Sequence, residues 1–236
     1  MPESLTLSRA IAIFALALAA LVLTGGCGPT LVKADYQMPH PLITPVKARV
    51  GLILDKELLA YHHQETRAGT DWDVELGTAT AKMWEDAFKA GFTDARIFGS
   101  LDEALAASSD LQAFAQPRIE QFSFATARET VGGHWAATLR LRLGVFSPTG
   151  QPVDSLTMNG YGNSFANGGA KKSLAFATRA ALRDASAKFL VQMPRQPIAA
   201  RLAAGDVIDA PTAPMLTADV IEAVPIDPVQ AVRPTP

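Results

Sequence analysis

Every second residue from Trp135 to Val145 is apolar, and most of the residues between them are polar or small. A period of two residues is typical of a β-strand with one buried and one solvated face. The segment Ser147-Pro148-Thr149-Gly150 then predicts a turn. We expect residues 153–162 to return from this turn as the antiparallel partner of the alternating strand. No other stretch constrains the fold as strongly.

Two further segments have the period of an α-helix. One is predicted to begin at Thr70 or Asp71, either of which is a favourable N-cap residue, and to end at Gly91. The other runs from Gly169 to Met193 and is stopped by a proline. The apolar residues of the first helix that share one face are Val74, Leu76, Met83, Trp84, Ala87 and Phe88.

The order of these segments predicts the fold class. Residues 46–54 and 95–98 are expected to be short strands on either side of the first helix, and residues 114–127 precede the alternating strand as another extended segment. The resulting order, β-α-β-β-β-β-α, predicts an α+β domain over residues 46–193. An antiparallel-rich sheet would carry both helices on one face. The strand–helix–strand opening leaves parallel pairing of its two strands open.

The segments flanking this domain are rich in proline. Residues 27–45 contain four prolines and no periodic apolar pattern, which predicts a tether with a reach of about 60 Å when fully extended. Residues 194–236 contain half of the 16 prolines and no aromatic side chain. This composition predicts a disordered tail, with a transient helix only near residues 197–204.

Near the start of the sequence, an uninterrupted apolar run of 14 residues extends from Ala10 to Leu23. A membrane-spanning helix needs about 20 apolar residues, so this length suits the hydrophobic region of a signal peptide. The run ends in Leu23-Thr24-Gly25-Gly26-Cys27, which resembles the lipobox of bacterial lipoproteins. Thr24 departs from the bulky aliphatic residue most common at its position. An ordinary secretory signal, or a membrane helix with an incidental cysteine, is the alternative.

The lipobox resemblance implies a signal peptide over residues 1–26, cleaved between Gly26 and Cys27. It also implies lipid, including palmitate-type acyl chains, on Cys27, which is the only cysteine and therefore cannot form an intramolecular disulfide. Gly28 follows, where an Asp marks inner-membrane retention in enteric lipoproteins. We therefore expect an anchor on the periplasmic face of the envelope, and in the outer rather than the inner membrane.

Few residues are candidates for catalysis or ligand binding. His62, His63 and Glu65 are the candidate metal ligands, but the helical spacing of zinc hydrolases is absent and a solvated loop is the simpler interpretation. Residues 160–164 and 168–173 are glycine-rich, yet their spacing fits neither a P-loop nor a dinucleotide fingerprint. They predict a flexible link, with anion binding at a helix N-terminus as the alternative.

Structural roles account for the other notable polar and aromatic residues. Asp71 and Asp73 would complement a helix dipole near the predicted helix start. Arg140 and Arg142 lie on the solvated face of the alternating strand, as solvated charges or as a basic stripe for a partner or for lipid headgroups. Trp84 is expected in the core. No catalytic residue and no metal site are predicted.

The organisation of the chain is similar to that of the small uncharacterised envelope lipoproteins of proteobacteria, of which the YajG type is one. The likeness covers about 165 residues. The segments that carry it are residues 23–27, 46–54, 72–92, 117–124, 135–146, 160–162 and 169–193. The resemblance implies a membrane-anchored periplasmic domain and supplies no catalytic residues. The long proline-rich tail departs from it.

These observations predict a non-enzymatic lipoprotein, without cofactor or metal, that binds or scaffolds an envelope component in outer-membrane maintenance or assembly. Its partners would be the membrane, through lipid on Cys27, and an envelope protein. A net charge of −2, from 21 basic and 23 acidic side chains, does not favour a nucleic-acid partner. The alternatives are an auxiliary lipoprotein of a transporter or secretion system, and a metal-dependent hydrolase that uses His62, His63 and Glu65.

Overall fold

A computed structural model describes residues 28–37, 39, 41–107, 110–165 and 168–209 of the chain. The strands are β1 (Thr30–Lys33), β2 (Val46–Ile53), β3 (His62–Arg67), β4 (Thr70–Glu75), β5 (Phe92–Phe98), β6 (Ala113–Ala125), β7 (His134–Phe146) and β8 (Pro152–Phe165). The helices are α2 (Lys56–Leu59), α3 (Gly77–Gly91), α4 (Leu101–Ala106), α5 (Ala170–Gln192) and α6 (Pro197–Ala203), with a 3-10 turn at Met193–Arg195.

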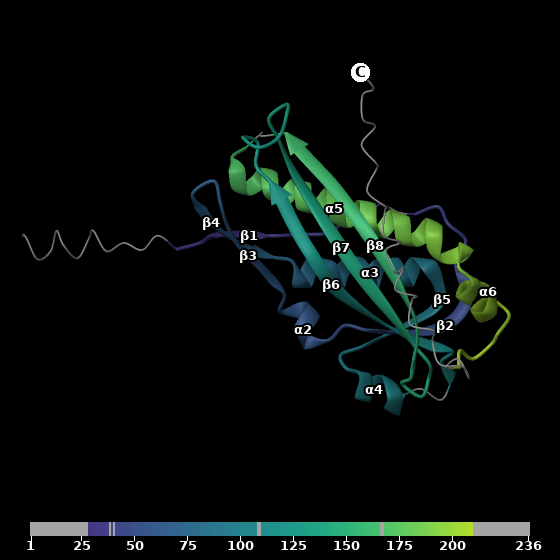
Figure 1. The fold of residues 1–236 in the computed structure, drawn as a ribbon. Coiled ribbons are helices and arrows are strands. Elements are labelled where there is room, and N and C mark those ends of the chain that lie inside the picture. The colour runs from purple at the N-terminus through teal and green to yellow at the C-terminus, as the bar shows by residue number, and fades with distance from the viewer. Residues whose placement is uncertain (1–27, 38, 40, 108–109, 166–167, 210–236) are drawn as a thin grey trace, which may run out of the picture.

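The main sheet has five strands in the order β5-β2-β6-β7-β8. Strands β6, β7 and β8 form the expected antiparallel meander. Strand β2 is parallel to β5 and to β6, so β2, α3 and β5 form a βαβ unit. Helices α3 and α5 cover one face of this sheet (Figure 1). The predicted fold class, α+β with two helices on one face, is therefore confirmed.

The core lies between this sheet and the two long helices. The alternation in β7 directs Leu139, Leu141 and Leu143 into the core, while Arg140 and Arg142 stay exposed on the other face. The helices meet through aromatic rings, with Phe88 of α3 stacked on Phe189 of α5 at a centroid distance of 5.4 Å. The long-range apolar contacts of the fold therefore join segments about 100 residues apart.

Glycines in β8 allow the backbone of α5 to pack directly against the backbone of the sheet. A Cβ atom on Gly160 would lie 2.2 Å from the carbonyl oxygen of Ala181, and one on Gly162 would lie 2.2 Å from that of Ala177. Real Cβ atoms do not come this close to backbone atoms. Small residues on both surfaces thus set the spacing between α5 and β8, and this is the role of the glycine-rich segment 160–162.

A second, three-stranded sheet has the order β1-β4-β3. The predicted helix start at Thr70 or Asp71 is wrong, because both residues belong to β4 and pair with β3. The hairpin turns at Ala68 and Gly69, whose φ angles of 51° and 75° are those that a tight two-residue turn requires. Helix α3 begins only at Gly77.

Residues 30–37 belong to the fold rather than to a free tether. Strand β1 pairs in parallel with β4, and Val32 is fully buried. Beyond it, the hydroxyl of Tyr36 donates to Ser186 Oγ of α5 at 2.9 Å. The proline content suggested an extended chain, and the segment is extended, but its apolar residues give it a docking surface on α5. We call residues 34–37, 39 and 41–45 the strap.

The fold also extends beyond the predicted boundary at residue 193. Helix α6 buries Ile198 and Leu202. The side-chain amide of Gln112 donates to the carbonyl oxygen of Leu202 at 2.8 Å, and Ile208 N–H donates to the carbonyl of Gln112 at 2.9 Å. Residues 210–236 lie outside the described part of the chain, so the disordered tail stays a prediction there.

The anchor segment, residues 1–27, also lies outside the described residues, and with it the whole lipobox and Cys27. Among the helices that the structure describes, none combines the length and apolar character needed to cross a membrane. The test of the anchor therefore depends on chemistry at Cys27 rather than on the described fold.

The spacing of α5 and β8 gives the first prediction. We expect Gly162→Ala to lower the free energy of unfolding by about 3 kcal/mol or more, because the new methyl group meets backbone that cannot move independently. Gly99→Ala is the matched control, since its Cβ would lie 3.4 Å from the flexible Glu103 carboxylate. Urea unfolding of both variants measures this difference, and equal stabilities would contradict it.

Candidate functional site

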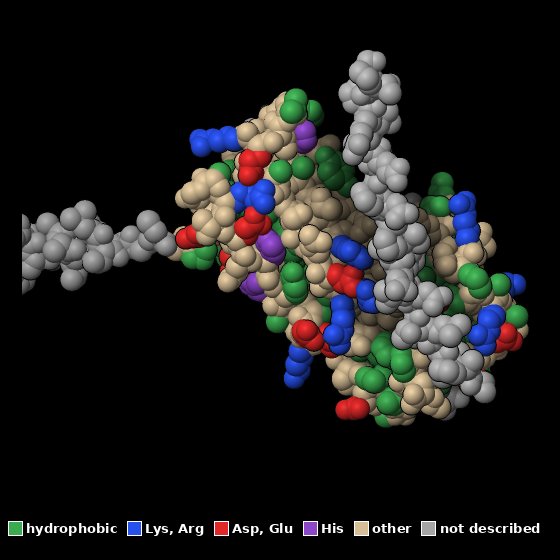
Figure 2. Space-filling view, in the orientation of Figure 1, with side chains coloured by type: hydrophobic (Ala, Val, Ile, Leu, Met, Phe, Trp, Pro, Cys, Tyr) green, Lys and Arg blue, Asp and Glu red, His purple; other side chains and the backbone are tan. Residues whose placement is uncertain are grey.

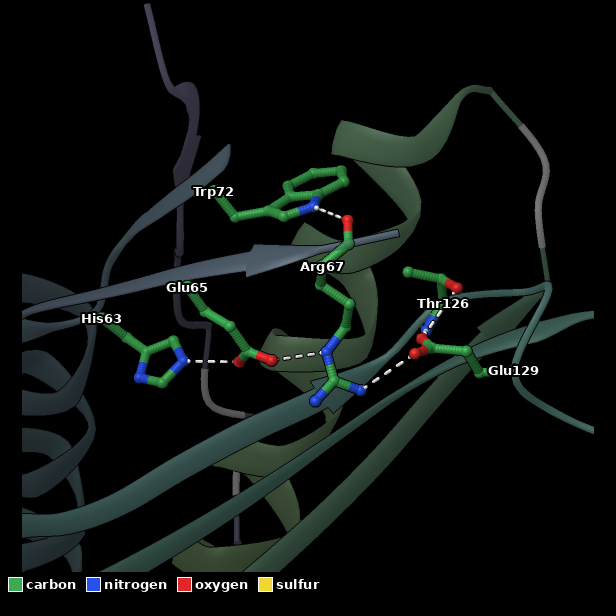
Figure 3. A network of polar contacts seen from close by, with 6 residues as sticks. All are labelled: His63, Glu65, Arg67, Trp72, Thr126 and Glu129. Atoms are coloured by element: carbon green, nitrogen blue, oxygen red, sulfur yellow. Dashed lines mark hydrogen bonds and ion pairs between the residues drawn. The ribbon is translucent and has the colours of Figure 1, made fainter. Parts of the chain in front are cut away.

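A chain of polar contacts links β3 to the loop that follows β6 (Figure 3). His63 Nε2 lies 2.9 Å from Glu65 Oε2, and Arg67 Nε donates to Glu65 Oε1 at 2.5 Å. Arg67 Nη1 reaches Glu129 Oε1 at 3.4 Å. The backbone N–H and the hydroxyl of Thr126 both donate to Glu129 Oε2 at 2.8 Å. We call these five residues the β3 network.

The β3 network rests on aromatic rings. Residues 63, 65 and 67 lie two apart, so their side chains share the face of β3 that is turned toward β6. The His63 ring meets Phe122 edge-on at 5.1 Å, and the Arg67 guanidinium lies 5.2 Å above the Phe124 ring. Aromatic contacts with Phe122 and Phe124, together with the ion pair between Arg67 and Glu129, hold the small sheet against β6 and the loop that follows it.

Trp72 of β4 continues this aromatic layer. Its indole N–H donates to the carbonyl oxygen of Arg67 at 3.4 Å (Figure 3). Its ring packs edge-on against Phe124 at 5.7 Å and against Trp135 at 5.5 Å. Trp72 is therefore a core residue between the two sheets. Trp84 of α3 is also in the core, as predicted.

The carboxylates of the β3 network are held in their charged form. Partial burial raises the pKa of Glu65, but hydrogen bonds from His63 and Arg67 outweigh it and hold that pKa below its ordinary value of 4.5. The backbone N–H and hydroxyl of Thr126 lower the pKa of Glu129 in the same way. At neutral pH the network therefore contains paired charges, and the pairing of Arg67 with Glu65 and Glu129 suits a structural role that joins β3 to the loop after β6.

The candidate metal ligands do not converge. His62 and His63 are neighbours on β3, which is a strand and not the predicted loop, and they point to opposite faces. His62 Nδ1 lies 2.9 Å from Asp73 Oδ1, on the side away from the His63–Glu65 pair. Within the described residues, no group of three His, Cys, Asp or Glu side chains is placed to hold a metal ion.

The acidic pair on β4 has a role different from the predicted one. Asp71 accepts a hydrogen bond from the Thr66 hydroxyl at 2.6 Å, and Asp73 accepts one from Gln64 at 3.2 Å. The hydrogen bond with His62 is the largest cause that lowers the pKa of Asp73. Both residues therefore make cross-strand pairs in the β3–β4 hairpin and do not cap a helix.

Arg140 and Arg142 are partly neutralised by one carboxylate. Glu120 Oε2 lies 3.0 Å from Arg140 Nε, and Glu120 Oε1 pairs with Arg142. The register of β6 against β7 shifts between Ile119 and Gln121, so Glu120 lies in a bulge opposite both arginines. Basic and acidic side chains alternate over this face rather than forming a large patch of one sign (Figure 2).

Two of the cavities in the described part of the structure lie beside features already introduced, and neither was predicted from the sequence. One, of about 340 Å³, lies beside the β3 network, between the β3–β4 turn, the loop after β6 and the start of α5; its lining includes Arg67, Thr70, Trp72, Thr126, Arg128, Trp135 and Gly169. The other, of about 440 Å³, lies under the strap and is mostly apolar; its lining includes Tyr36, Pro39, Pro41, Ile43, Leu190 and Val191. Both need segments distant in sequence, so no local pattern signals them.

Comparisons with known proteins identify no family for this chain. No protein-family model matches the chain, and no curated protein matches it. Among solved structures, it is similar to protein XCC0632 from Xanthomonas campestris, of family model DUF330, at 12% identity and a TM-score of 0.49, over 75% of this chain and 99% of that chain.

Two further solved structures are less similar. The PelC dodecamer from Paraburkholderia phytofirmans matches over 63% of this chain and 95% of that chain, at 15% identity and a TM-score of 0.31. Lipoprotein GNA1162 from Neisseria meningitidis matches over 50% of this chain and 84% of that chain, at 7% identity and a TM-score of 0.28. Likeness at this level identifies neither a family nor a function.

The β3 network gives the second prediction. We expect Glu65→Gln to lower the free energy of unfolding by about 1–2 kcal/mol at pH 7, because it removes the central charge that Arg67 and His63 share. Glu85→Gln is the control, since Glu85 forms an i,i+4 pair with Lys89 on the surface of α3. That change should cost about 0.5 kcal/mol or less.

The pH dependence follows from the lowered pKa of Glu65. The pKa of Glu65 is lower in the folded state than in the unfolded state, so its negative charge stabilises the fold at pH values above the unfolded-state pKa. This stabilisation is lost as the pH falls through the folded-state pKa. The difference in the free energy of unfolding between wild type and Glu65→Gln should therefore have its full size at pH 7 and shrink below about pH 4. A difference that is constant from pH 7 to pH 3 would contradict this role of Glu65.

Proposed function

We propose that the chain is a lipid-anchored, non-enzymatic lipoprotein of the bacterial envelope that binds or scaffolds another envelope component. The observation that carries the proposal is the apolar run of 14 residues that ends in Leu23-Thr24-Gly25-Gly26-Cys27. A run of this length suits export, and the single cysteine at its end is placed for lipid attachment. Two or three acyl chains on Cys27 would give stable membrane attachment, whereas one chain is marginal.

The state of the polar side chains supports a non-enzymatic role. The histidines and carboxylates of β3 and β4 are taken up by hydrogen bonds and ion pairs, either between the two strands, as in His62–Asp73, or along β3, as in His63–Glu65 and Glu65–Arg67. A catalytic group needs a free position near a substrate site and a pKa matched to proton transfer. The lowered pKa of Glu65 instead favours a permanent negative charge, which suits a structural contact.

The likeness to the YajG type of envelope lipoprotein is part of the proposal. It is supported by the order of the segments and by Gly28, which is not the Asp of inner-membrane retention. We therefore place the anchor in the inner leaflet of the outer membrane, with the folded part in the periplasm. The component bound there would be a protein of outer-membrane maintenance or assembly.

Replacement of the cysteine tests this proposal. In a diderm bacterial host, the wild-type chain should be cut before Cys27, take up an alkyne-labelled palmitate and enter the outer-membrane fraction. Cys27→Ser should take up no label and keep its signal peptide, because serine offers no thiol for lipid transfer. Thr24→Leu, which brings the segment closer to the usual lipobox, is the control and should be processed fully. Unchanged cleavage and membrane retention in Cys27→Ser would refute lipidation.

A further inference from the structure

We propose that the end of the fold next to Cys27 is itself a membrane-binding surface, which rests on the anionic headgroups of the bilayer that holds the anchor. This inference rests on the proposed lipidation of Cys27. It adds a second contact with the membrane, made by side chains of the folded part rather than by acyl chains.

The first step is covalent. Only Gly28 and Pro29 separate Cys27 from Thr30, the first residue of β1. Consecutive Cα atoms are 3.8 Å apart, so the Cα atoms of Cys27 and Thr30 are at most about 11 Å apart. Because Thr30 is paired with Trp72 inside the small sheet, this limit applies to the fold itself. A lipidated Cys27 therefore brings this end of the fold to the headgroups.

The second step is the set of elements at this end. Thr30 lies at the end of the small sheet where β3 and β4 turn at Ala68 and Gly69. The cavity of about 340 Å³ places the loop after β6 and the first residues of α5 beside that turn. The chain enters the fold at the end where these segments gather (Figure 1). We call the turn, residues 126–133, Phe165 and residues 168–172 the anchor end.

The third step is apolar exposure. Val131 is 98% exposed and Phe165 is 69% exposed, and both lie at the anchor end. The rings of Phe165 and His134 are in contact at 6.5 Å, which joins the end of β8 to the loop that contains Val131. Large apolar side chains at the tips of a domain are suited to insertion among headgroups, where they lose contact with water.

The fourth step is charge. Arg128, Lys171 and Lys172 are exposed cations, and none of them forms an ion pair with a residue that the structure describes. Among the residues of the anchor end, these three cations are accompanied by one carboxylate, Glu129, which is itself paired with Arg67 and accepts a hydrogen bond from Thr126. The anchor end thus has a local positive excess although the chain carries a net charge of −2. Such clusters are attracted to anionic lipid.

The test uses the full lipidated chain and an engineered cysteine. Lipid blocks Cys27, the only native thiol, so a thiol-reactive nitrobenzoxadiazole dye labels only the new position. Val131→Cys places the dye at the anchor end. Val207→Cys is the control, because Val207 is 51% exposed and its neighbour Ile208 bonds to Gln112, at the opposite end of β6. The 13 residues of β6 separate the two ends by about 40 Å.

The labelled chains are reconstituted in vesicles of phosphatidylethanolamine and phosphatidylglycerol. We expect the dye at residue 131 to shift its emission to the blue and to be quenched by headgroup-labelled nitroxide lipid, while the dye at residue 207 does neither. Replacement of Arg128, Lys171 and Lys172 together by Glu should remove at least half of the quenching at residue 131. The same dye response at both positions would overturn the proposal.

The outcomes separate this inference from the proposed function. A chain that does not float with the vesicles, or whose Cys27 takes up the dye, would refute lipidation itself. A chain that floats normally but shows no quenching at residue 131 would refute the membrane-binding surface and leave the anchor in place. Protection of residue 131 only after addition of outer-membrane proteins would assign the surface to a protein partner, and would also refute the inference.

Discussion

The pairing of β1 with β4 holds residues 30–33, which closely follow the proposed lipidation site at Cys27, inside the small sheet. Four backbone positions, Thr30 to Lys33, are in register with Trp72 to Glu75. The side chain of Val32 in this segment is fully buried in the core. Without this pairing, residues 28–45 would be the long tether that their prolines suggest. With it, Tyr36 of the strap is hydrogen-bonded to Ser186 of α5, and Thr30 lies at the end of the small sheet where β3 and β4 turn. The proposed lipid on Cys27 would therefore lie next to this end of the fold.

Most of the main sheet, helix α5 and the C-terminal end of helix α3 were predictable, because their signals are local. Strand β7 alternates in sequence and packs one face on the core, so pattern and structure agree from residue 134 to residue 146. Helix α5 runs within one residue of its predicted start and end, since a proline and a glycine-rich link bound it. The role of Gly162 was not predictable, because it depends on Ala177 of a separate segment.

The small sheet and the candidate site were missed for one physical reason. All six side chains of β3, from His62 to Arg67, are polar, so the strand carries no apolar alternation. The packed face of β3 is defined by residues distant in sequence. Phe122 and Phe124 contact the His63 and Arg67 side chains, and Glu129 pairs with Arg67. The sequence places His62 and His63 side by side, but the strand sends them to opposite faces, where His62 contacts Asp73 of β4 and His63 contacts Glu65 of β3.

We propose that the fold begins directly after a lipidated Cys27 and leaves no free tether between the membrane and β1. Neutron reflectometry of the lipidated chain on a supported bilayer measures this directly, because it resolves the water between the headgroups and the protein layer. We expect protein density that starts at the headgroups. A water layer of several tens of ångströms, up to the roughly 60 Å that an extended segment 28–45 would span, would contradict it.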